Sequence, residues 1–213
     1  MAAQAARPAY PVRFSVDTPD APRNRLTTFF RVLLVIPIAI VLGTISGGSF
    51  TWTTENGGQA AAAAGGFLVL APLLMILFRE KYPRWWFDWN VGLWRFENRV
   101  VSYLAFLRDE YPSTDEEQAV HLEVDYPDVP NDLNRWLPLV KWFLAIPHYI
   151  VLFFLSIAAF FVVIFTWFAI LFTGKYPQSC FDFVVGVMRW HIRVQGYAFL
   201  LVTDRYPPFS LDP

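Results

Sequence analysis

The segment FREKYPRWWFDWNVGLWRFENRVVSY, residues 78–103, returns in altered form as FTGKYPQSCFDFVVGVMRWHIRVQGY, residues 172–197. Both segments keep Lys-Tyr-Pro, Phe-Asp, Val-Gly, two arginines and a final tyrosine at the same spacing. Self-similarity of this kind indicates repeated structural units that pack against each other. We therefore predict that the chain contains two copies of one unit.

The similarity continues upstream of these segments. Val16-Asp17 is echoed by Val124-Asp125, and Ile36-Pro37 is echoed by Ile146-Pro147. An acidic stretch separates the two copies, and its polar composition is typical of a linker. The predicted organisation is a first unit at 1–112, the linker at 113–118 and a second unit at 119–213.

The composition favours a membrane protein. Hydrophobic residues make up 55% of the chain and charged residues only 16%, whereas an ordinary soluble domain has about a quarter charged residues. Apolar runs at 27–46 and 60–78 each approach the length of about 20 residues that crosses a hydrocarbon core. Arg31, the one charge in the first run, lies near its start, where a long side chain can reach the interface.

A longer apolar run, residues 136–173, contains few polar residues. It is long enough for two helices of about 18 residues joined by a tight turn near residues 155–158. The alternative is a re-entrant hairpin that dips into the membrane without crossing it. We expect four transmembrane helices, arranged as two hairpins in a parallel repeat.

Each predicted hairpin is flanked by two further elements. Apolar and polar residues alternate in 12–17 and in 120–125, which predicts two half-buried strands. The exits at 107–111 and 202–206 are candidates for two further strands of a small cytoplasmic sheet. Residues 87–106 and 181–200 predict amphipathic helices that lie at the membrane interface. The expected fold is therefore mainly α and integral to the membrane, with short β-strands.

The distribution of charge predicts the orientation in the membrane. All 17 Lys and Arg residues lie outside the two predicted hairpin tips, 47–59 and the turn near residue 156. By the positive-inside rule, both termini are cytoplasmic. The expected location is the cytoplasmic membrane of a bacterium, with several crossings.

One face of each predicted interfacial helix carries a stripe of polar residues and glycine. Its spacing places the members on the same side of a helix, and they are Asp88, Gly92, Arg95 and Arg99 in the first copy and Asp182, Gly186, Arg189 and Arg193 in the second. Guanidinium groups match phosphate geometry, so the four arginines are candidates to bind anionic lipid headgroups, with the aspartates and glycines in support. Alternatively, the stripe is the hydrated face of an interfacial helix, and the aspartates stabilise its amino end.

Gly43 and Gly47 form a small-xxx-small step in the first hairpin. Small residues let helix backbones approach closely in lipid, so we expect these glycines to pack within the hairpin. A dimer face is the alternative.

Few residues suggest catalysis or metal binding. The single cysteine, Cys180, excludes an internal disulfide and a multi-cysteine metal site. We find no phosphate-binding glycine loop, nucleophile elbow or paired His-Glu motif. His121 shares a strand face with two carboxylates, but Arg13 stands at the matching position of the first copy. His148 and His191 receive no specific role. We expect no catalytic residue, no cofactor and no bound metal.

The repeated motifs, together with Asp-x-Pro-Asp ahead of a proline-containing apolar run, resemble the bacterial membrane proteins grouped as domain of unknown function 4389. The resemblance extends from Tyr10 to Pro208. It implies no particular activity. Some actinobacterial relatives are associated with envelope lipid and lipoglycan pathways, which suggests a lipid role by analogy only.

Two functions are consistent with the sequence. The first is a non-catalytic accessory or scaffold subunit of a membrane complex, whose partners are membrane lipids and other membrane proteins or a second copy of the chain. The alternative is binding or transfer of anionic envelope lipids through the two arginine stripes. A channel is disfavoured because the apolar runs hold few polar residues to line a path. The formal net charge of −1 argues against nucleic acid as a partner.

Overall fold

The computed structural model describes residues 10–19, 22–46, 49–53, 59–63 and 65–213. The described chain is mainly helical. Its strands are β1 (Val12–Val16), β2 (Ser49–Thr53), β3 (Gln59–Ala63) and β4 (Val120–Val124). Its helices are α1 (Arg25–Leu34), α2 (Ile36–Ser46), α3 (Gly65–Arg79), α4 (Arg84–Leu104), α5 (Val129–Asp132), α6 (Pro138–Leu144), α7 (Ile146–Thr173) and α8 (Gln178–Ala198).

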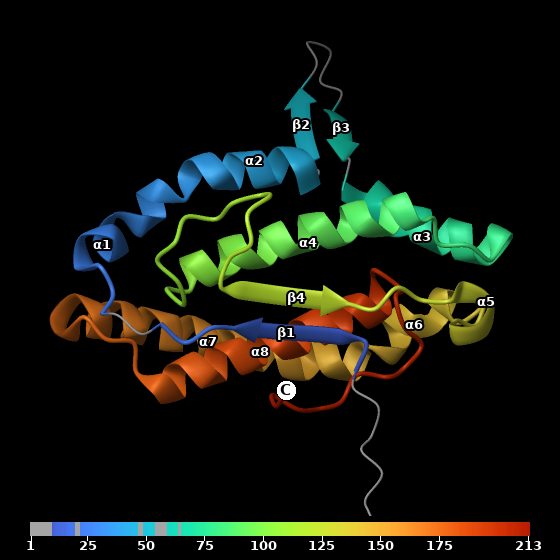
Figure 1. Cartoon of the computed structure of the whole chain (residues 1–213). Helices are drawn as coiled ribbons and strands as arrows, with labels where there is room; N and C mark the ends of the chain where they lie inside the picture. Colours follow the sequence, from blue (N-terminus) through green and yellow to red (C-terminus); the bar gives the residue numbers. More distant parts are fainter. Residues whose placement is uncertain (1–9, 20–21, 47–48, 54–58, 64) are drawn as a thin grey trace, which may run out of the picture.

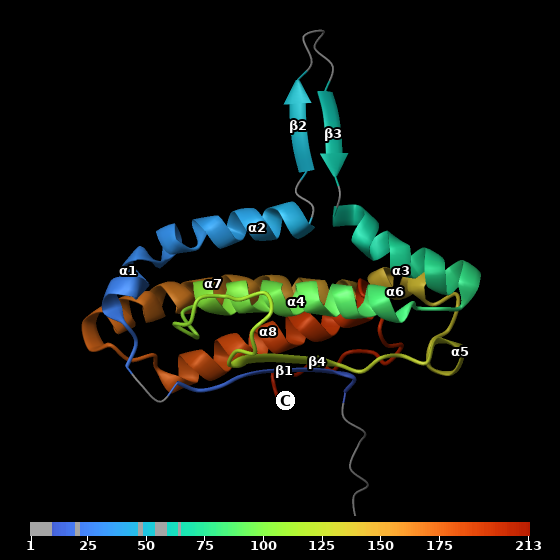
Figure 2. The ribbon, with the colours of Figure 1, turned by 45° about the horizontal axis from the view of Figure 1, so that its top comes forward.

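The elements stack in three layers (Figure 1). The sheet of β1 and β4 forms the first layer, and α4 and α8 form the second. The outer layer holds α1, α2, α3, α6 and α7, with α2 against α4 and α7 against α8. In both views, α4, α7, α8 and the two strands run in roughly the same direction (Figure 2). The layers are therefore nearly parallel to one another.

The sheet confirms the two strands predicted from alternation, whereas the exits at 107–111 and 202–206 form no strand in the described chain. β1 and β4 pair antiparallel, with Phe14 opposite Leu122 at the centre. Both side chains are buried in the main core between the sheet and the second layer, where Trp94 of α4 and Ile192 of α8 meet them. The intervening residues, such as Arg13, face outward. A two-stranded sheet is marginal alone in water, so this packing is what stabilises it.

The two halves of the chain exchange their strands. β1, from the amino-terminal half, packs on α8, and β4, from the carboxyl-terminal half, packs on α4. Gly196 permits the first of these contacts, because a Cβ at this position would lie 2.9 Å from Cγ2 of Val12. β1 therefore packs on α8 instead of α4, and β4 packs on α4 instead of α8.

The predicted turn near residues 155–158 is wrong. α7 is one continuous helix of 28 residues, about 42 Å long at 1.5 Å per residue. Residues 148–173 contain no glycine or proline that would break it. Gly174, with φ 74°, ends the helix in the left-handed conformation. The second predicted hairpin is thus replaced by the short helix α6 and the long helix α7, which meet at Ala145.

The first predicted hairpin is also different. The run 60–78 is not one helix, because Gln59–Ala63 forms β3, which pairs with β2. α3 begins only at Gly65 and has 15 residues, too few to cross a hydrocarbon core. Among the described residues, two segments are long and apolar enough to cross a membrane, Arg25–Gly43 and Ile146–Thr173. The structure therefore offers two candidate membrane spans instead of the four predicted.

Candidate functional site

Two of the stripe arginines bind the free edges of the small sheet. Arg95 Nε donates a hydrogen bond to the carbonyl oxygen of Leu122 at 2.9 Å, and Arg189 Nε donates to that of Phe14 at 3.0 Å. These carbonyls belong to one cross-strand pair and point away from each other. Each edge of the sheet is thus held by an arginine from the helix that covers it, which satisfies polar groups that an edge strand leaves unpaired.

The other two stripe arginines hold the segments that follow the helices. Arg99 Nη1 donates to the carbonyl oxygen of Ser113 at 2.8 Å. Arg193 Nη2 donates to the carbonyl oxygen of Asp212 at 2.7 Å, and Arg189 Nη1 donates to that of Leu211 at the same distance. Burial lowers the pKa of the Arg189 and Arg193 guanidinium groups from the ordinary value. The stripe therefore faces the sheet and these segments, although guanidinium donors remain for another ligand.

The aspartates of the stripe bond within their own helices. Asp88 Oδ1 accepts from Arg84 Nε at 3.3 Å, and Asp182 Oδ1 accepts from Gln178 Nε2 at 2.8 Å. Both aspartates are exposed. They lie one turn inside the amino ends of α4 and α8, where a negative charge stabilises a helix.

The glycines have different surroundings. A Cβ at Gly186 would lie 2.9 Å from Cβ of Leu211, so this glycine lets the carboxyl-terminal segment approach α8. A Cβ at Gly92 or Gly43 would meet no described atom within 4 Å. Gly47, the other residue of the predicted packing step, lies outside the described residues.

Two buried ion pairs escaped the sequence analysis. Arg31 is fully buried, pairs with Asp109, and has Cζ 4.4 Å from the centroid of the Tyr103 ring. Lys141 is also fully buried; its Nζ lies 2.7 Å from Asp204 Oδ1.

The cations of the two ion pairs, Arg31 and Lys141, also make similar contacts with backbone carbonyl groups and tyrosine rings. Lys141 Nζ donates to the carbonyl oxygen of Thr203 at 2.8 Å and lies 5.2 Å from the Tyr197 ring centroid. Arg31 Nη1 donates to the carbonyl oxygens of Tyr103 and Arg108, each at 3.0 Å. The prediction that Arg31 reaches the membrane interface is therefore wrong. The available signal was one cation in each of the apolar runs 27–46 and 136–173, and an aspartate shortly after each of α4 and α8.

Two histidines make contacts within the apolar layers. His148 Nδ1 accepts a hydrogen bond from Trp190 Nε1 at 3.0 Å, and its ring stacks on Phe209. His191 Nε2 lies 2.8 Å from Ser156 Oγ.

The second pair has the composition of a nucleophile and a base, but its hydrogen bonding differs. The Ser156 hydroxyl donates to the carbonyl oxygen of Leu152 at 2.6 Å, so we assign His191 Nε2 as a donor to Ser156. A serine activated for attack would give its proton to the histidine instead. Among the described residues, no group of three or more His, Cys, Asp or Glu side chains could hold a metal ion.

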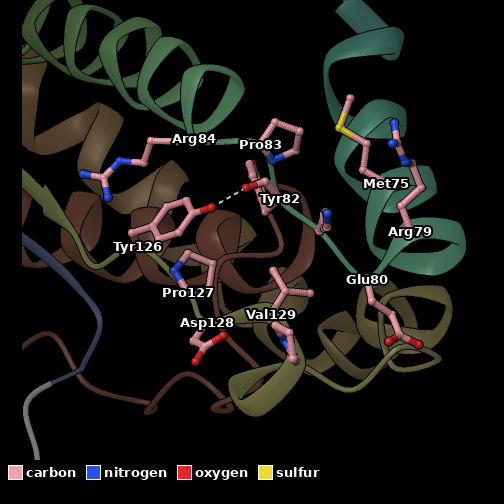
Figure 3. A pocket seen from close by; sticks show the side chains of 12 residues that line it. Met75, Arg79, Glu80, Tyr82, Pro83, Arg84, Tyr126, Pro127, Asp128 and Val129 are labelled. Carbon is pink, nitrogen blue, oxygen red and sulfur yellow. Dashed lines mark hydrogen bonds between the residues drawn. The ribbon is translucent and has the colours of Figure 1, made fainter.

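A cavity of about 520 Å³ lies where α3 ends, α4 begins and α5 follows β4. Its lining includes three apolar residues, Met75, Tyr82 and Val129, and three cationic ones, Arg79, Lys81 and Arg84 (Figure 3). The Tyr126 hydroxyl donates to the Tyr82 carbonyl oxygen and closes one side. We call this space the α3–α4 cavity.

A smaller cavity, of about 240 Å³, lies at the corresponding junction between α7 and α8. Lys175 and Tyr176 line it, as Lys81 and Tyr82 line the α3–α4 cavity. Gln178 stands at the start of α8 where Arg84 begins α4. The two junctions therefore differ in size and in cationic charge.

Residues 136–210 match the family model described as Domain of unknown function (DUF4389). The matched segment contains α6, α7, α8 and the buried pair of Lys141 with Asp204. No curated protein and no solved structure matches the chain. The DUF4389 match supports the predicted resemblance over the second half of the chain and names no activity.

Proposed function

We propose that this protein is a non-catalytic membrane protein that lies flat in one leaflet and serves as an accessory or scaffold subunit of a membrane complex. The observation that carries the proposal is that apolar and charged surfaces lie on opposite sides of the layered fold. The outer layer exposes large apolar side chains, and the outward face of the sheet carries charges.

The apolar surface is extensive on α7. Phe154, Phe161 and Phe168 are 64%, 63% and 48% exposed, and they recur along one side of the helix. α1 and α6 add further exposed residues, among them Phe29 and Trp142. Soluble monomers rarely expose contiguous apolar patches of more than a few hundred Å². Lipid is the solvent that this surface suits.

The parallel layers favour a flat orientation over a crossing one. If α7 stood upright in the bilayer, then α8 and the sheet beside it would also lie at hydrocarbon depth. Arg13 bonds Glu123 and Asp125 on the outward face of that sheet, and all three side chains are substantially exposed. Charged groups in hydrocarbon are costly. When the layers lie flat, this charged face is in water and the phenylalanines are in lipid.

Finer features of the proposal rest on correspondences between the halves. The buried pairs of Arg31 and Lys141 have similar partners. Phe106 (φ 61°) and Leu201 (φ 57°) both adopt the left-handed conformation just beyond their long helices. These correspondences favour two copies of one unit. We further propose that the charged sheet and both termini face the cytoplasm of a bacterium, in line with the family resemblance.

The flat orientation is testable by the depth of spin labels. In a Cys180→Ser background, single labels replace Phe154, Ile157, Phe161, Ile164 and Phe168 on α7 in turn. A flat helix gives similar depths at every position, whereas a crossing helix gives a steep gradient of depth. A label at Ser15, on the sheet, should be accessible to water in the flat orientation. A depth gradient along α7 would overturn the proposal.

The accessory role needs a separate test. Native mass spectrometry of the protein, gently extracted from its own membrane, should show other membrane proteins or a second copy at fixed stoichiometry. Recovery of the monomer alone, under conditions that preserve a known complex from the same membrane, would contradict this role.

Anionic-lipid binding is the second candidate function. The observation in its favour is that cationic side chains border exposed apolar surface at the α3–α4 cavity. Arg95 and Arg99 line a separate cavity of about 280 Å³ beside the sheet. Neutralising Arg95, Arg99, Arg189 and Arg193 should reduce retention of anionic lipid if the stripes bind it. Unchanged retention in the folded variant would exclude the stripes.

A further inference from the structure

The α3–α4 cavity combines an apolar wall with two cations that are free to bind a ligand. The side chains of Arg79 and Lys81 line it and make no ion pair or hydrogen bond within the described part of the chain. Both residues are exposed. Their charges are therefore not neutralised by the protein itself.

The two carboxylates at this cavity already have partners. Glu80 Oε1 lies 2.9 Å from Arg135 Nη1, and Asp128 Oδ2 accepts a hydrogen bond from Asn131 Nδ2 at 2.7 Å. Neither of these carboxylates is bonded to Arg79 or Lys81. The lining therefore carries three cationic and two anionic side chains, and one of the anions, Glu80, is already paired with Arg135.

The third cation, Arg84, borders the cavity on the opposite side. Its Cζ lies 4.7 Å from the centroid of the Tyr126 ring, and its Nε contacts Asp88. The aromatic ring holds the guanidinium in place by a cation–π interaction, and the remaining donors of the group stay available.

Exposed apolar side chains on α3 adjoin residues that line the cavity. Leu74 and Phe78 lie beside Met75 and Arg79 on α3 and are 43% and 70% exposed. A ligand with an anionic head and an apolar tail would bury its head among the cations and its tail along α3. Burying an acyl chain contributes about 0.8 kcal/mol per CH₂ group, so the tail adds to affinity.

We infer that the α3–α4 cavity binds the phosphate group of an anionic amphiphile, with Arg79 and Lys81 on the phosphate and the acyl chain along α3. This inference deepens the second candidate function and moves its site away from the arginine stripes. The group that this site would recognise is a phosphate ester. Such a group occurs both in lipid headgroups and in soluble phosphate compounds.

The chain contains a matched control for this site. At the junction of α7 and α8, Lys175 is the counterpart of Lys81, Thr173 stands in place of Arg79, and the cavity has less than half the volume, about 240 Å³ against 520 Å³. Arg25 lies beside this junction, with Nε 3.5 Å from the Cβ position of Gly174. Removing Arg25 and Lys175 changes the net charge by the same amount as removing Arg79 and Lys81.

The test is calorimetric titration of the full chain in non-ionic detergent with dihexanoylphosphatidic acid. The double variant Arg79→Gln/Lys81→Gln should weaken binding by about tenfold or more, whereas Arg25→Gln/Lys175→Gln should leave it within about twofold. Equal losses in the two double variants would show a general charge effect and overturn the inference. Unchanged binding in the first variant would also overturn it. Unchanged unfolding transitions would show that the exposed substitutions leave the fold intact.

Two further ligands distinguish the source of the phosphate. Dihexanoylphosphatidylcholine, which has no net charge, should bind much more weakly than the phosphatidic acid, and equal binding would overturn the inference. Glycerol 3-phosphate should also bind weakly if the natural ligand is a lipid, whereas equal affinity would assign the site to a soluble phosphate ester. Because these short-chain ligands need no bilayer, failure of the flat orientation would leave this test unaffected.

Discussion

Arg95 and Arg189 bind the two carbonyl groups of a single residue pair, Leu122 and Phe14, from opposite edges of the sheet. One arginine comes from α4 and the other from α8. The small sheet is thus fastened to both helices of the second layer at its centre. This arrangement gives the stripe arginines a structural role whether or not they also contact lipid.

Loss of either central arginine should destabilise the fold. Arg95→Gln and Arg189→Gln should each lower the free energy of unfolding by about 1.5–3 kcal/mol, because each removes a hydrogen bond from a charged donor to a backbone carbonyl. Arg13→Gln is the control, since Arg13 forms only exposed ion pairs, worth up to about 1 kcal/mol each. Denaturant unfolding in detergent, followed by tryptophan fluorescence, measures the differences. Equal effects of Arg189→Gln and Arg13→Gln would refute the structural role.

The two helix glycines should respond differently to alanine. Gly186→Ala should destabilise the protein by about 1–3 kcal/mol, because the new Cβ would overlap Leu211. Gly92→Ala should be neutral or stabilise by up to about 1 kcal/mol, because alanine is the better helix former and the described surroundings of Gly92 are open. Thermal unfolding of the two variants side by side is the measurement. A Gly92→Ala variant as unstable as Gly186→Ala would contradict the packing described.

The buried pair of Lys141 and Asp204 should show strong coupling. Lys141→Met should destabilise by about 3–5 kcal/mol, because it leaves a partly buried carboxylate without its cation. Adding Asp204→Leu should recover part of this loss. The recovery is incomplete because Asp204 Oδ2 also accepts from the Asn134 backbone N–H. A double-mutant cycle in chemical denaturation measures the coupling, and strictly additive effects would contradict it.

Glu97, on α4, should make the stability of the protein depend on pH. Burial raises the pKa of its carboxyl group above the ordinary value of 4.5. The folded state therefore binds this proton more tightly than the unfolded state, and the contribution of Glu97 to stability falls as the pH rises from 4.5 through the folded pKa. Glu97→Gln should be more stable than the natural protein at neutral pH. This advantage should shrink as the pH falls toward 4.5, and a difference that does not vary with pH would be the contrary result.

The local elements were largely predictable because they carry clear periodic patterns. Alternation predicted strands at 12–17 and 120–125, and β1 and β4 occupy nearly those residues. The period of the stripe predicted the helices that became α4 and α8. In both cases the pattern of nearby residues shows which side of an element is buried, without showing which segment covers it.

The errors came from properties that a local pattern does not contain. Apolar length in 136–173 suggested two helices, but only a breaking residue places a turn, and α7 has none after Pro147. The stripe predicted a common face for Arg95 and Arg99 without indicating what covers it. The segment that covers Arg95 is β4, which follows α4 in sequence. The segment that covers Arg189 is β1, which lies far away in the sequence. Similarly, the buried Arg31 has a partly exposed partner, Asp109, that no spacing rule connects to it.

The exchange of strands between the halves affects how the chain can fold during synthesis. β1 leaves the ribosome long before α8, the helix on which it packs, because the other helices lie between them in sequence. Contacts between such distant segments form slowly, because a long loop must close before they can form. Until α8 emerges, the apolar residues Val12, Phe14 and Val16 lack their binding surface. We therefore expect a chaperone, or the membrane itself, to shield β1 until α8 has been synthesised.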